Sequence, residues 1–386
     1  MKSLKVAMIG HGFMGAAHSQ GWRTAHRVFQ MPASPQMAVL VGRDDARTAV
    51  AAAKWGWETQ STNWREVIER EDIDIIDIVT PGASHAEIAI AALEAGKHVL
   101  CEKPLANTVD EAQLMARAAE QAAARGVQSM VGFTYRRVPA ATLMRQLIAQ
   151  GVLGQIQQVR ASYRQDWLVD PAAPLSWRLQ QDQAGSGALG DIGAHAIDLV
   201  QFTTGLRTEQ VSGVLQTVTE HRPRADGSGF GQVSVDDLAL FTGRLSNGAL
   251  ASFEASRVAT GRKNALSIEV SGSKGALAFD LEDLNSLQYY NREDPQEIQG
   301  FRKILVTEPV HPYLSGWWPA GHMLGYEHGF SHQVKDLVEA IIHGTPAHST
   351  FAEGLGVQQV LDAVSRSAAN QSLWTSVAHP ADIHVA

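Results

Sequence analysis

The fold is decided by Lys5-Val6-Ala7-Met8-Ile9-Gly10-His11-Gly12-Phe13-Met14-Gly15, a short apolar run that ends in three glycines with G-x-G-x-x-G spacing. This spacing suits a strand that turns into a helix, because the glycines permit a tight turn, a close approach of a pyrophosphate, and helix-on-strand packing. The amides of the helix N-terminus would then face the phosphates. The alternative is a glycine-rich turn without a ligand. The residues expected to hold a dinucleotide cofactor here are Gly10, Gly12, Phe13, Met14 and Gly15.

The first third of the sequence alternates short β-rich runs with helical ones, which is typical of a parallel sheet with crossover helices. Strands are predicted at residues 5–9, 37–41, 73–79, 98–101 and 128–132. A helix is predicted at 86–95, and another at 108–125 opens with Thr108 and Glu111 in capping-box spacing. We therefore expect a doubly wound α/β domain over residues 1–133.

From residue 134 to 386 the pattern changes to longer alternating runs, which favour an α+β domain built on a large, mostly antiparallel sheet. The runs cover 156–163, 209–219, 236–245 and 249–259. Asn247-Gly248 predicts a hairpin whose two central residues both have positive φ, and 222–231 is expected to be a surface loop. Helices are predicted at 326–343 and 351–371, and we expect these C-terminal helices to pack back on the first domain.

Composition excludes several classes of function. The 386 residues carry a formal net charge of −8 and have no dense basic run. The apolar stretches stop short of the roughly 20 residues that span a bilayer. Nucleic acid and membrane are therefore not expected as partners, and no metal site is predicted. With an N-terminus that passes directly into a strand and a single cysteine, Cys101, the sequence predicts a cytoplasmic protein with a buried, inert thiol.

The end of the second strand bears on the choice between NAD and NADP. A carboxylate there binds the ribose diol of NAD, whereas an arginine can pair with the 2′-phosphate of NADP. Gly42 stands where the carboxylate is expected, and Arg43 and Asp44 follow it. Since Arg43 can also stack on adenine and Asp44 can still reach the ribose, both cofactors remain open.

Residues after two later strands are expected at the carboxyl edge of the sheet, where ligands of such folds bind. Thr80, Pro81 and His85 are predicted to form a wall of the cofactor site; the alternative is a plain strand-terminating turn. Glu102 and Lys103 follow the next strand. A lysine beside a nicotinamide suggests hydride chemistry on an alcohol, in which its ammonium group holds the reacting oxygen.

A helical interpretation of Gly190–Asp198 places Asp191, His195 and Asp198 on one face. Oxidation of a secondary alcohol requires removal of the hydroxyl proton, and histidine suits that role at neutral pH. We therefore predict that His195 acts as the base and that Asp191 shares its site. The alternative is a core histidine bonded to a backbone carbonyl, and Asp198 is expected to be structural.

Aromatic and amide side chains gather between the first strand of the second domain and Asp191. Flat apolar faces edged by hydrogen-bonding groups suit a sugar, although such tryptophans can also anchor a domain core. Tyr135 and Arg136 follow the last parallel strand and are expected to face the same cleft, unless they form a solvated hinge. The dense stretch contains Tyr163, Gln165, Asp166, Trp167, Trp177 and Arg178.

Three motifs together resemble the Gfo/Idh/MocA family of sugar and cyclitol dehydrogenases. These are Gly10–Gly15, the run Ala91–Val99 leading into Glu102-Lys103-Pro104, and Asp191-x-Gly193-x-His195. The resemblance covers nearly all of the sequence and is more specific than any single motif. It implies a Rossmann domain, an open-faced sheet domain, and assembly as a homodimer or homotetramer through that sheet.

The same resemblance implies roles for individual residues. Lys103, Asp191 and His195 would form the catalytic set. Segments 165–167, 174–178 and 184–191 resemble members that oxidise anhydrosugars or the C3 hydroxyl of glycosides. A departure is Gly42-Arg43, where the anhydrosugar-oxidising member has a carboxylate. Tyr135, Gln165, Trp167 and Trp177 would line the sugar site, and Arg136, Trp177 and Arg178 would also contact the cofactor.

The function expected from these residues is reversible, NAD(P)-dependent oxidation of a ring hydroxyl on a pyranose, anhydrosugar, glycoside or inositol, most specifically at C3. Two alternatives remain open at this stage. One is a cofactor-binding regulator that keeps the fold without the chemistry, which the intact Lys103, Asp191 and His195 argue against. The other is an enzyme that cleaves a glycosidic bond through transient oxidation.

Overall fold

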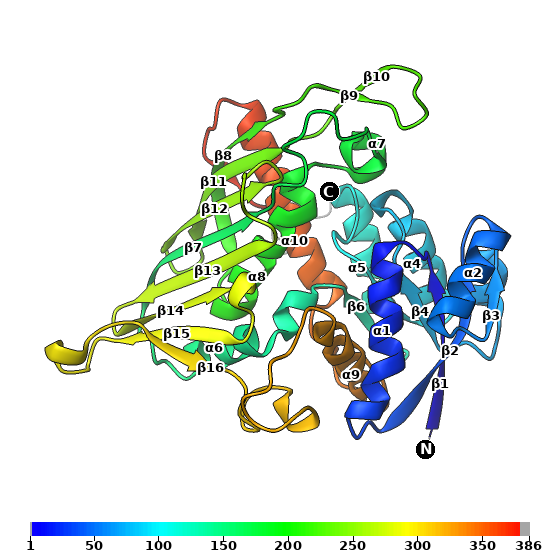
Figure 1. Cartoon of the computed structure of the whole chain (residues 1–386), viewed down its shortest axis with the longest axis horizontal. Coiled ribbons are helices and arrows are strands. Elements are labelled where there is room, and N and C mark those ends of the chain that lie inside the picture. Colours follow the sequence, from blue (N-terminus) through cyan, green and yellow to red (C-terminus); the bar gives the residue numbers. More distant parts are fainter. Residues whose placement is uncertain (1, 379–386) are drawn as a thin grey trace. The chain divides into compact units, whose positions relative to one another are not determined.

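The computed structural model describes residues 2–378 (Figure 1). The described chain forms two compact units. Unit 1 contains the residues up to Arg137 together with Gly325–Leu355, and unit 2 contains Val138–Leu324 together with the residues from Gly356 onward. Within residues 2–378, no helix is both long enough and apolar enough to cross a membrane. The division of the sequence into domains at residues 133 and 134 stays a prediction.

Unit 1 is a doubly wound α/β unit, as the alternating pattern predicts. Its six strands are all parallel and stand in the order β3-β2-β1-β4-β5-β6. The chain therefore builds the sheet from β1 to β3 on one side and then continues from β4 to β6 on the other side of β1. Short β3 was not predicted, because its three residues are too few to show a pattern. The strands are β1 (Lys2–Ile9), β2 (Ala33–Val41), β3 (Thr59–Ser61), β4 (Ile75–Ile78), β5 (His98–Cys101) and β6 (Ser129–Val131).

Helices cover this sheet, and their ends follow local sequence signals. The predicted capping box is confirmed, since the side chain of Thr108 accepts from the Glu111 amide and the Glu111 side chain accepts from the Thr108 amide. Helix α9 (His328–His343) crosses α1 so closely that a Cβ on Gly21 would lie 2.9 Å from Phe330. The other helices are α1 (Phe13–Val28), α2 (Asp45–Trp55), α3 (Trp64–Glu69), α4 (His85–Glu94) and α5 (Val109–Ala123).

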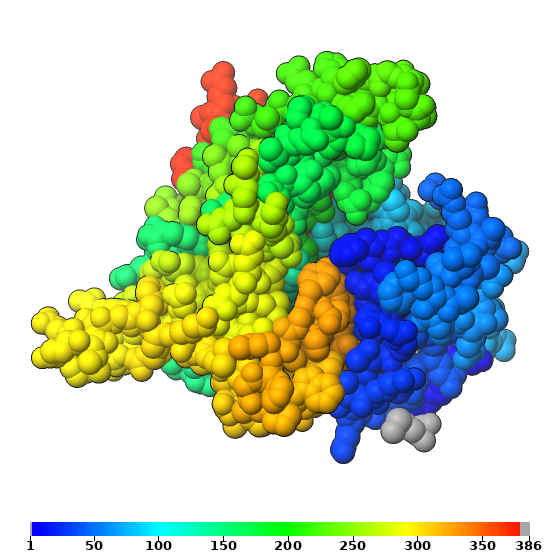
Figure 2. All heavy atoms as spheres, viewed as in Figure 1, coloured from blue at the N-terminus to red at the C-terminus, as the bar shows by residue number. Residues whose placement is uncertain are grey.

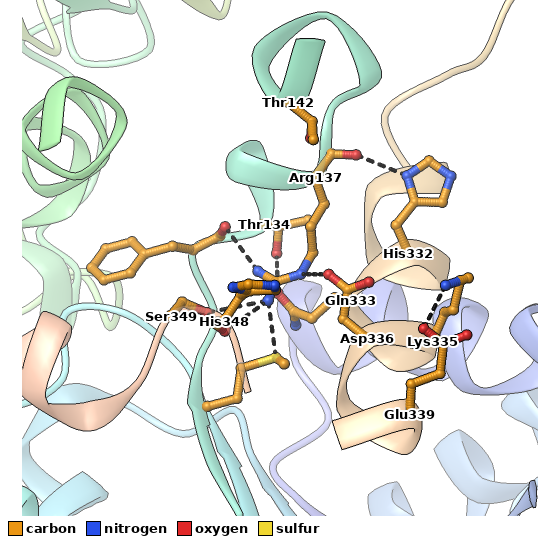
Figure 3. A network of polar contacts seen from close by, with 12 residues as sticks. Thr134, Arg137, Thr142, His332, Gln333, Lys335, Asp336, Glu339, His348 and Ser349 are labelled. Atoms are coloured by element: carbon orange, nitrogen blue, oxygen red, sulfur yellow. Dashed lines mark hydrogen bonds and ion pairs between the residues drawn. The ribbon is translucent and has the colours of Figure 1, made fainter. Parts of the chain in front are cut away.

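Arg137 fixes the returning segment of the chain to the end of β6 (Figure 3). Its buried guanidinium donates from Nε to Asp336 at 3.0 Å and from Nη2 to the carbonyl of His348 at 2.9 Å. The ring of His332 donates from Nδ1 to the Arg137 carbonyl at 2.8 Å. A buried cation is tolerated only when acceptors surround it, so these contacts lock α9 beside the short 3₁₀ helix η2 (Thr134–Arg137).

Unit 2 is built on one nine-stranded sheet, which confirms the prediction of a large, mostly antiparallel sheet. The order is β16-β15-β14-β13-β7-β12-β11-β8-β17. The exception is the pairing of β7 with β12, which is parallel. The strands are β7 (Ile156–Arg164), β8 (Thr208–Gln216), β11 (Leu238–Leu245), β12 (Leu250–Ser256), β13 (Ala265–Gly272), β14 (Gly275–Asp280), β15 (Ser286–Asn291), β16 (Arg302–Leu305) and β17 (Thr375–Ser376).

The two faces of this sheet differ. Along β11, Ala239 and Phe241 are buried, whereas Leu240 and Thr242 are exposed, and the other central strands alternate in the same way. Figure 1 shows helices on one face only in the described part of unit 2. The alternation arises because successive side chains of a strand point to opposite faces. The covering helices are α6 (Pro139–Ala149), α8 (Ala194–Thr204) and the part of α10 (Phe351–Ala369) from Gly356 onward.

Two turn predictions need correction. Asn247-Gly248 does join β11 to β12, but only Gly248 of the pair has positive φ, +87°. The Asn247 side chain accepts from the Ala249 amide at 3.0 Å and supports a turn of another type. Residues 222–231, expected as a loop, contain parts of β9 (His221–Pro223) and β10 (Phe230–Gln232), which form the hairpin labelled in Figure 1. Its atoms lie among the green spheres at the top of Figure 2.

Candidate active site

The glycine turn of unit 1 has the geometry that a dinucleotide requires. Gly10 has φ of +106°, and a Cβ there would lie 2.9 Å from the carbonyl oxygen of Val79. A Cβ on Gly15 would lie 2.9 Å from the Gly10 oxygen, whereas one on Gly12 would meet no atom within 4 Å. Helix α1 begins at the next residue, and no acidic residue stands in its first turn within the described chain. The turn therefore leaves open space and unopposed amides for a pyrophosphate.

Aromatic rings lie beside this turn. Phe13 is exposed and stacks on Tyr326, with ring centroids 6.3 Å apart, and Met14 is half-buried. Tyr326 also contacts the ring of Tyr135 at 6.4 Å. Burial raises the pKa of Tyr326 further above its ordinary value, so its hydroxyl stays neutral. Sequence reasoning missed Tyr326, because it placed this residue inside the α9 helix.

At the end of β2 the structure explains why glycine stands at position 42. A Cβ on Gly42 would lie 2.3 Å from Oγ1 of Thr48 and 2.5 Å from the ring of His11. Asp44 caps helix α2, since its side chain accepts from the Arg47 amide at 2.9 Å. Arg43 is exposed beside it. Any side chain at position 42 would therefore have to displace those of Thr48 and His11, and the carboxylate of Asp44 is engaged in capping.

Thr80, Pro81 and His85 lie beyond β4, at the carboxyl edge where they were predicted. The His85 ring is buried, with Nε2 at 2.9 Å from the Thr80 oxygen and Nδ1 at 3.1 Å from the Pro104 oxygen. Burial lowers the pKa of His85. This ring thus links the turn after β4 to the segment that follows Lys103.

Glu102 is part of a buried charge network that supports Lys103. His18 on α1 contacts Asp77 from Nδ1 and Glu102 from Nε2, each at 2.9 Å. Burial alone would lower the pKa of His18, but Asp77 and Glu102 raise it to about 10. Glu102 also accepts from the Lys103 amide at 3.2 Å. The imidazolium therefore fixes the carboxylate that precedes Lys103 in the chain.

The residues of η2 have different surroundings. Tyr135 is 8% exposed and belongs to the aromatic group beside the glycine turn. Arg136 is buried and donates to Glu353 at 2.7 Å. Burial alone would raise the pKa of Glu353, but Arg136 lowers it. The structure thus gives Arg136 an ion pair within unit 1.

In unit 2, Asp191 lies in the π-helical turn η4 (Leu189–Gly193), which passes into α8. The prediction that a regular α-helix carries it together with His195 is wrong for this turn, because a π-turn is wider than an α-turn. At the start of this turn, the amides of Gly187 and Leu189 donate to the side chain of Asp236 at 2.8 Å and 2.7 Å. Burial raises the pKa of Asp236. The irregular backbone is thus held by one buried carboxyl group.

His195 and Asp198 are both buried on α8. A circuit, here meaning an unbroken series of side-chain contacts, joins Asp191 to His195 through Trp167 and Gln165, two of the four other residues predicted to line the sugar site. Its contacts are Arg257 Nη2 to Asp191 Oδ2 (2.9 Å), the Arg257 guanidinium over the Trp167 ring (5.4 Å), Trp167 Nε1 to Gln165 Oε1 (3.0 Å), Gln165 Nε2 to Asn264 Oδ1 (2.9 Å), the Tyr163 hydroxyl to Asn264 Oδ1 (2.6 Å), and the Tyr163 ring to the His195 ring (5.8 Å).

Trp177 and Arg178 form a second group in unit 2. Trp177 is 38% exposed and begins the short helix η3 (Trp177–Leu179). The Arg178 guanidinium lies 4.5 Å from the Trp177 ring centroid. The Arg178 carbonyl accepts from Nη1 of Arg257 at 3.3 Å, so this group is connected to the circuit.

Sequence reasoning missed four residues that the structure brings to these sites. Tyr326 and His18 belong to unit 1, and Arg257 and Asn264 belong to unit 2. His18 had a readable signal, since it lies three positions after Gly15 on the helix that follows the glycine turn. Arg257 follows β12 and Asn264 precedes β13, and the sequence does not reveal that both of these strands pair with β7.

Comparison with known proteins places the whole chain. A model of the oxidoreductase family with an NAD-binding Rossmann fold matches residues 4–133, and one of the GFO/IDH/MocA C-terminal domain matches residues 142–278. The chain is 39% identical over 391 residues to levoglucosan dehydrogenase of Pseudarthrobacter phenanthrenivorans, a match that covers 98% of this chain and 99% of the relative.

Solved structures agree with this similarity. The crystal structure of an oxidoreductase domain protein from Kribbella flavida has a TM-score of 0.96 and 58% identity, covering 98% of this chain and 100% of that one. Levoglucosan dehydrogenase in complex with NADH and levoglucosan has a TM-score of 0.93 and 40% identity, covering 97% of this chain and 100% of that one. The chain belongs to the Gfo/Idh/MocA family and is an oxidoreductase that uses NAD or NADP.

Proposed function

We propose that this enzyme oxidises a secondary ring hydroxyl of a sugar or cyclitol to the ketone, reversibly, and that the hydroxyl is the one at C3 of a glucose-type ring. The observation that carries the proposal is the circuit in unit 2 that ties Asp191 and His195 to Gln165 and Trp167. It sets a base, a carboxylate, an amide and an indole ring in one group. The similarity to a levoglucosan dehydrogenase supports a pyranose, anhydrosugar or glycoside as the substrate class.

The chemistry requires a hydride acceptor, a proton acceptor and a group that holds the reacting oxygen. A bound nicotinamide would supply the acceptor for the hydride that leaves the carbinol carbon. His195 takes the hydroxyl proton, and Asp191 orients the site in which it does so. Lys103 holds the oxygen as it gains alkoxide character, and its backbone is set by the Glu102 carboxylate.

Two groups of residues carry the binding. Trp167 and Trp177, which are both exposed in part, offer flat faces to a sugar ring, and Gln165 and Tyr135 supply polar edges. The glycine turn holds the pyrophosphate. The remaining cofactor contacts in this proposal come from Phe13, Met14, Arg43, Asp44, Thr80, Pro81, His85, Glu102, Lys103, Arg136, Trp177 and Arg178.

A homodimer or homotetramer that forms through the uncovered face of the unit 2 sheet completes the proposal. A shallow hollow on that face is lined by a mixture of small, apolar and charged side chains, among them Leu240, Ser252 and Ala278. A second copy of the chain would cover this face as the helices cover the other one.

The proposal is tested by mixing the enzyme with NAD or NADP and a panel of pyranoses, anhydrosugars, glucosides and inositols. Formation of reduced nicotinamide is followed, and the ketone position is assigned by NMR of the product. His195→Ala should then lower kcat by about 10² to 10⁴-fold. The Kd of the cofactor should stay within about threefold of the wild-type value, which is a change of less than about 1.4 kcal/mol.

The matched control is His221→Ala, which removes an exposed histidine of β9 in the same unit. Its kcat should equal that of the wild type. Turnover of His195→Ala within a few-fold of the wild type would end the assignment of the base. No reduced cofactor with any sugar, despite tight cofactor binding, would overturn the proposed function.

A further inference from the structure

Arg257 is a fully buried cation at the end of β12, next to the residues of the proposed reaction. We propose that Arg257 is a positioning residue, which holds the Asp191 carboxylate and the Trp167 ring in one fixed arrangement for the sugar. The inference rests on the proposed function, because it concerns the geometry of that same site. Arg257 itself is placed behind the residues that meet the substrate.

The guanidinium reaches three segments of unit 2 that are far apart in the sequence. Nη2 donates to Oδ2 of Asp191 at 2.9 Å, and Nη1 donates to the carbonyl of Arg178 at 3.3 Å. The centroid of the Trp167 ring lies 5.4 Å from the guanidinium carbon. The π-turn, the η3 segment and the loop after β7 therefore share one anchor.

Burial makes this anchor rigid. The Arg257 side chain is 1% exposed, whereas that of Asp191 is 27% exposed. The carboxylate is therefore the solvent-accessible member of the ion pair. A buried guanidinium without its carboxylate is strongly unfavourable, which holds both groups in place. The backbone of Arg257 adds to this, since its amide donates to Asp237 at 2.9 Å and its carbonyl accepts from Leu168 at 3.1 Å.

Arginine is needed here because one planar group serves acceptors in two directions and also stacks on a ring. A lysine ammonium is a point charge that can pair with Asp191 but does not stack in the same way. Trp167 in turn donates to Gln165 at 3.0 Å. Movement of the guanidinium would therefore displace the indole and the amide as well as the carboxylate.

The expected effect is on the hydride-transfer step. A misplacement of about 1 Å in a reacting geometry can cost roughly 10²-fold in rate. Arg257→Met should lower kcat by about that factor, and Arg257→Lys should recover part of the loss. Most of the proposed cofactor contacts belong to unit 1, and Arg257 touches only the backbone of Arg178 among the others. Cofactor affinity should therefore stay within about threefold of the wild type.

The experiment measures kcat and KM per folded site, with the sites counted by cofactor titration, and the primary isotope effect with a sugar deuterated at the oxidised carbon. For Arg257→Met we expect a lower kcat and a larger isotope effect, because hydride transfer becomes slower than the other steps. A purely structural role would reduce the number of folded sites and leave both values per site unchanged.

A double-mutant cycle tests whether Arg257 acts through Asp191. In an Asp191→Asn background, Arg257→Met should cost less in kcat than it does in the wild type, because the part of the loss that acts through the carboxylate is already present and only the part through Trp167 remains. The control Arg366→Met removes an exposed ion pair with Asp362 on α10 and should leave kcat unchanged. If Arg257→Met fails to fold, Arg257→Lys carries the same measurements.

The outcomes separate the two proposals. An active wild type, with Arg257→Lys and Arg257→Met both retaining its kcat and isotope effect, overturns the positioning role and leaves the proposed function standing. Full additivity with Asp191→Asn also overturns it. A wild-type enzyme that oxidises no sugar overturns the proposed function and this inference together.

Discussion

Nε2 of His18 lies 2.9 Å from Oε1 of Glu102, the residue that precedes Lys103. Both side chains are almost completely buried. The other ring nitrogen faces Asp77, which also accepts from Nε1 of Trp22 at 2.7 Å. The ring of Phe330 closes the remaining side, with its centroid 5.3 Å from that of His18. One cation between two carboxylates therefore stands directly behind the lysine segment.

This arrangement predicts a stability that falls in alkali. Burial alone would lower the pKa of His18, but Asp77 and Glu102 raise it to about 10, above the ordinary 6.5. A raised pKa gives stability that is fully present below the unfolded value and is lost as pH rises through the folded value. His18→Gln should thus lower the free energy of unfolding by about 3–5 kcal/mol at pH 7, and the deficit should shrink toward pH 10.

Denaturant unfolding of both proteins in steps from pH 6 to pH 10 checks this, because other titrating groups cancel in the difference. The exposed His221→Gln serves as control and should show a constant difference near zero. A deficit for His18→Gln that does not change between pH 7 and pH 10 would mean that His18 is neutral in the folded protein.

Arg43 should decide how well NADP competes with NAD. It is exposed at the end of β2, next to Gly42, where a Cβ would meet the side chains of Thr48 and His11. An arginine pairs with a phosphate by charge-assisted hydrogen bonds. Arg43→Ala should therefore weaken NADP binding by about tenfold or more, which is 1.4 kcal/mol, and weaken NAD binding by less than threefold. Titration of nicotinamide fluorescence with both reduced cofactors measures the two values.

Lys54→Ala is the matched control, since it removes a cation at the far end of α2. It should change neither affinity. Equal losses for both cofactors in Arg43→Ala would mean that the arginine stacks on the adenine ring, which the two cofactors share.

Unit 1 could be predicted from sequence because its signals are local. The glycine turn, the β5 bounds at residues 98–101 and the capping box at Thr108 each depend on residues within a few positions of one another. The parallel, doubly wound arrangement also follows from alternating strands and helices, because parallel strands need crossover connections. Short β3 lies beyond such signals.

Unit 2 was less predictable because its contacts depend on which strands pair. β7 pairs in parallel with β12, so that Arg164 lies opposite Ser256 and the loop after β7 runs beside Arg257. Alternating hydrophobicity identifies each strand but not its neighbour. The predicted residues Gln165, Trp167, Asp191 and His195 do lie in one circuit; the arginine that completes it was hidden by this pairing.

Cys101 should be unreactive in the folded enzyme. It is fully buried at the end of β5, and burial raises its pKa well above the ordinary value, with the nearby Glu102 and Asp77 acting in the same direction. Because the thiolate is the reactive form, a thiol reagent should label the native protein at less than about one hundredth of the rate seen in denaturant. Stoichiometric labelling of the native protein within the mixing time would contradict this.

The uncovered face of the unit 2 sheet should carry the contact between copies of the chain. Leu240 lies on that face and is 43% exposed. An arginine at this position would be buried in the contact without a carboxylate to pair with, and an unpaired buried charge strongly weakens association. Light scattering after size-exclusion chromatography should therefore show a dimer or tetramer for the wild type and monomers for Leu240→Arg at the same concentration.

The matched control is Leu114→Arg, which introduces the same charge at an exposed leucine of α5 in unit 1 and should leave the molecular mass in solution unchanged. A monomeric wild type, or an unchanged mass for Leu240→Arg, would place the contact elsewhere or remove it.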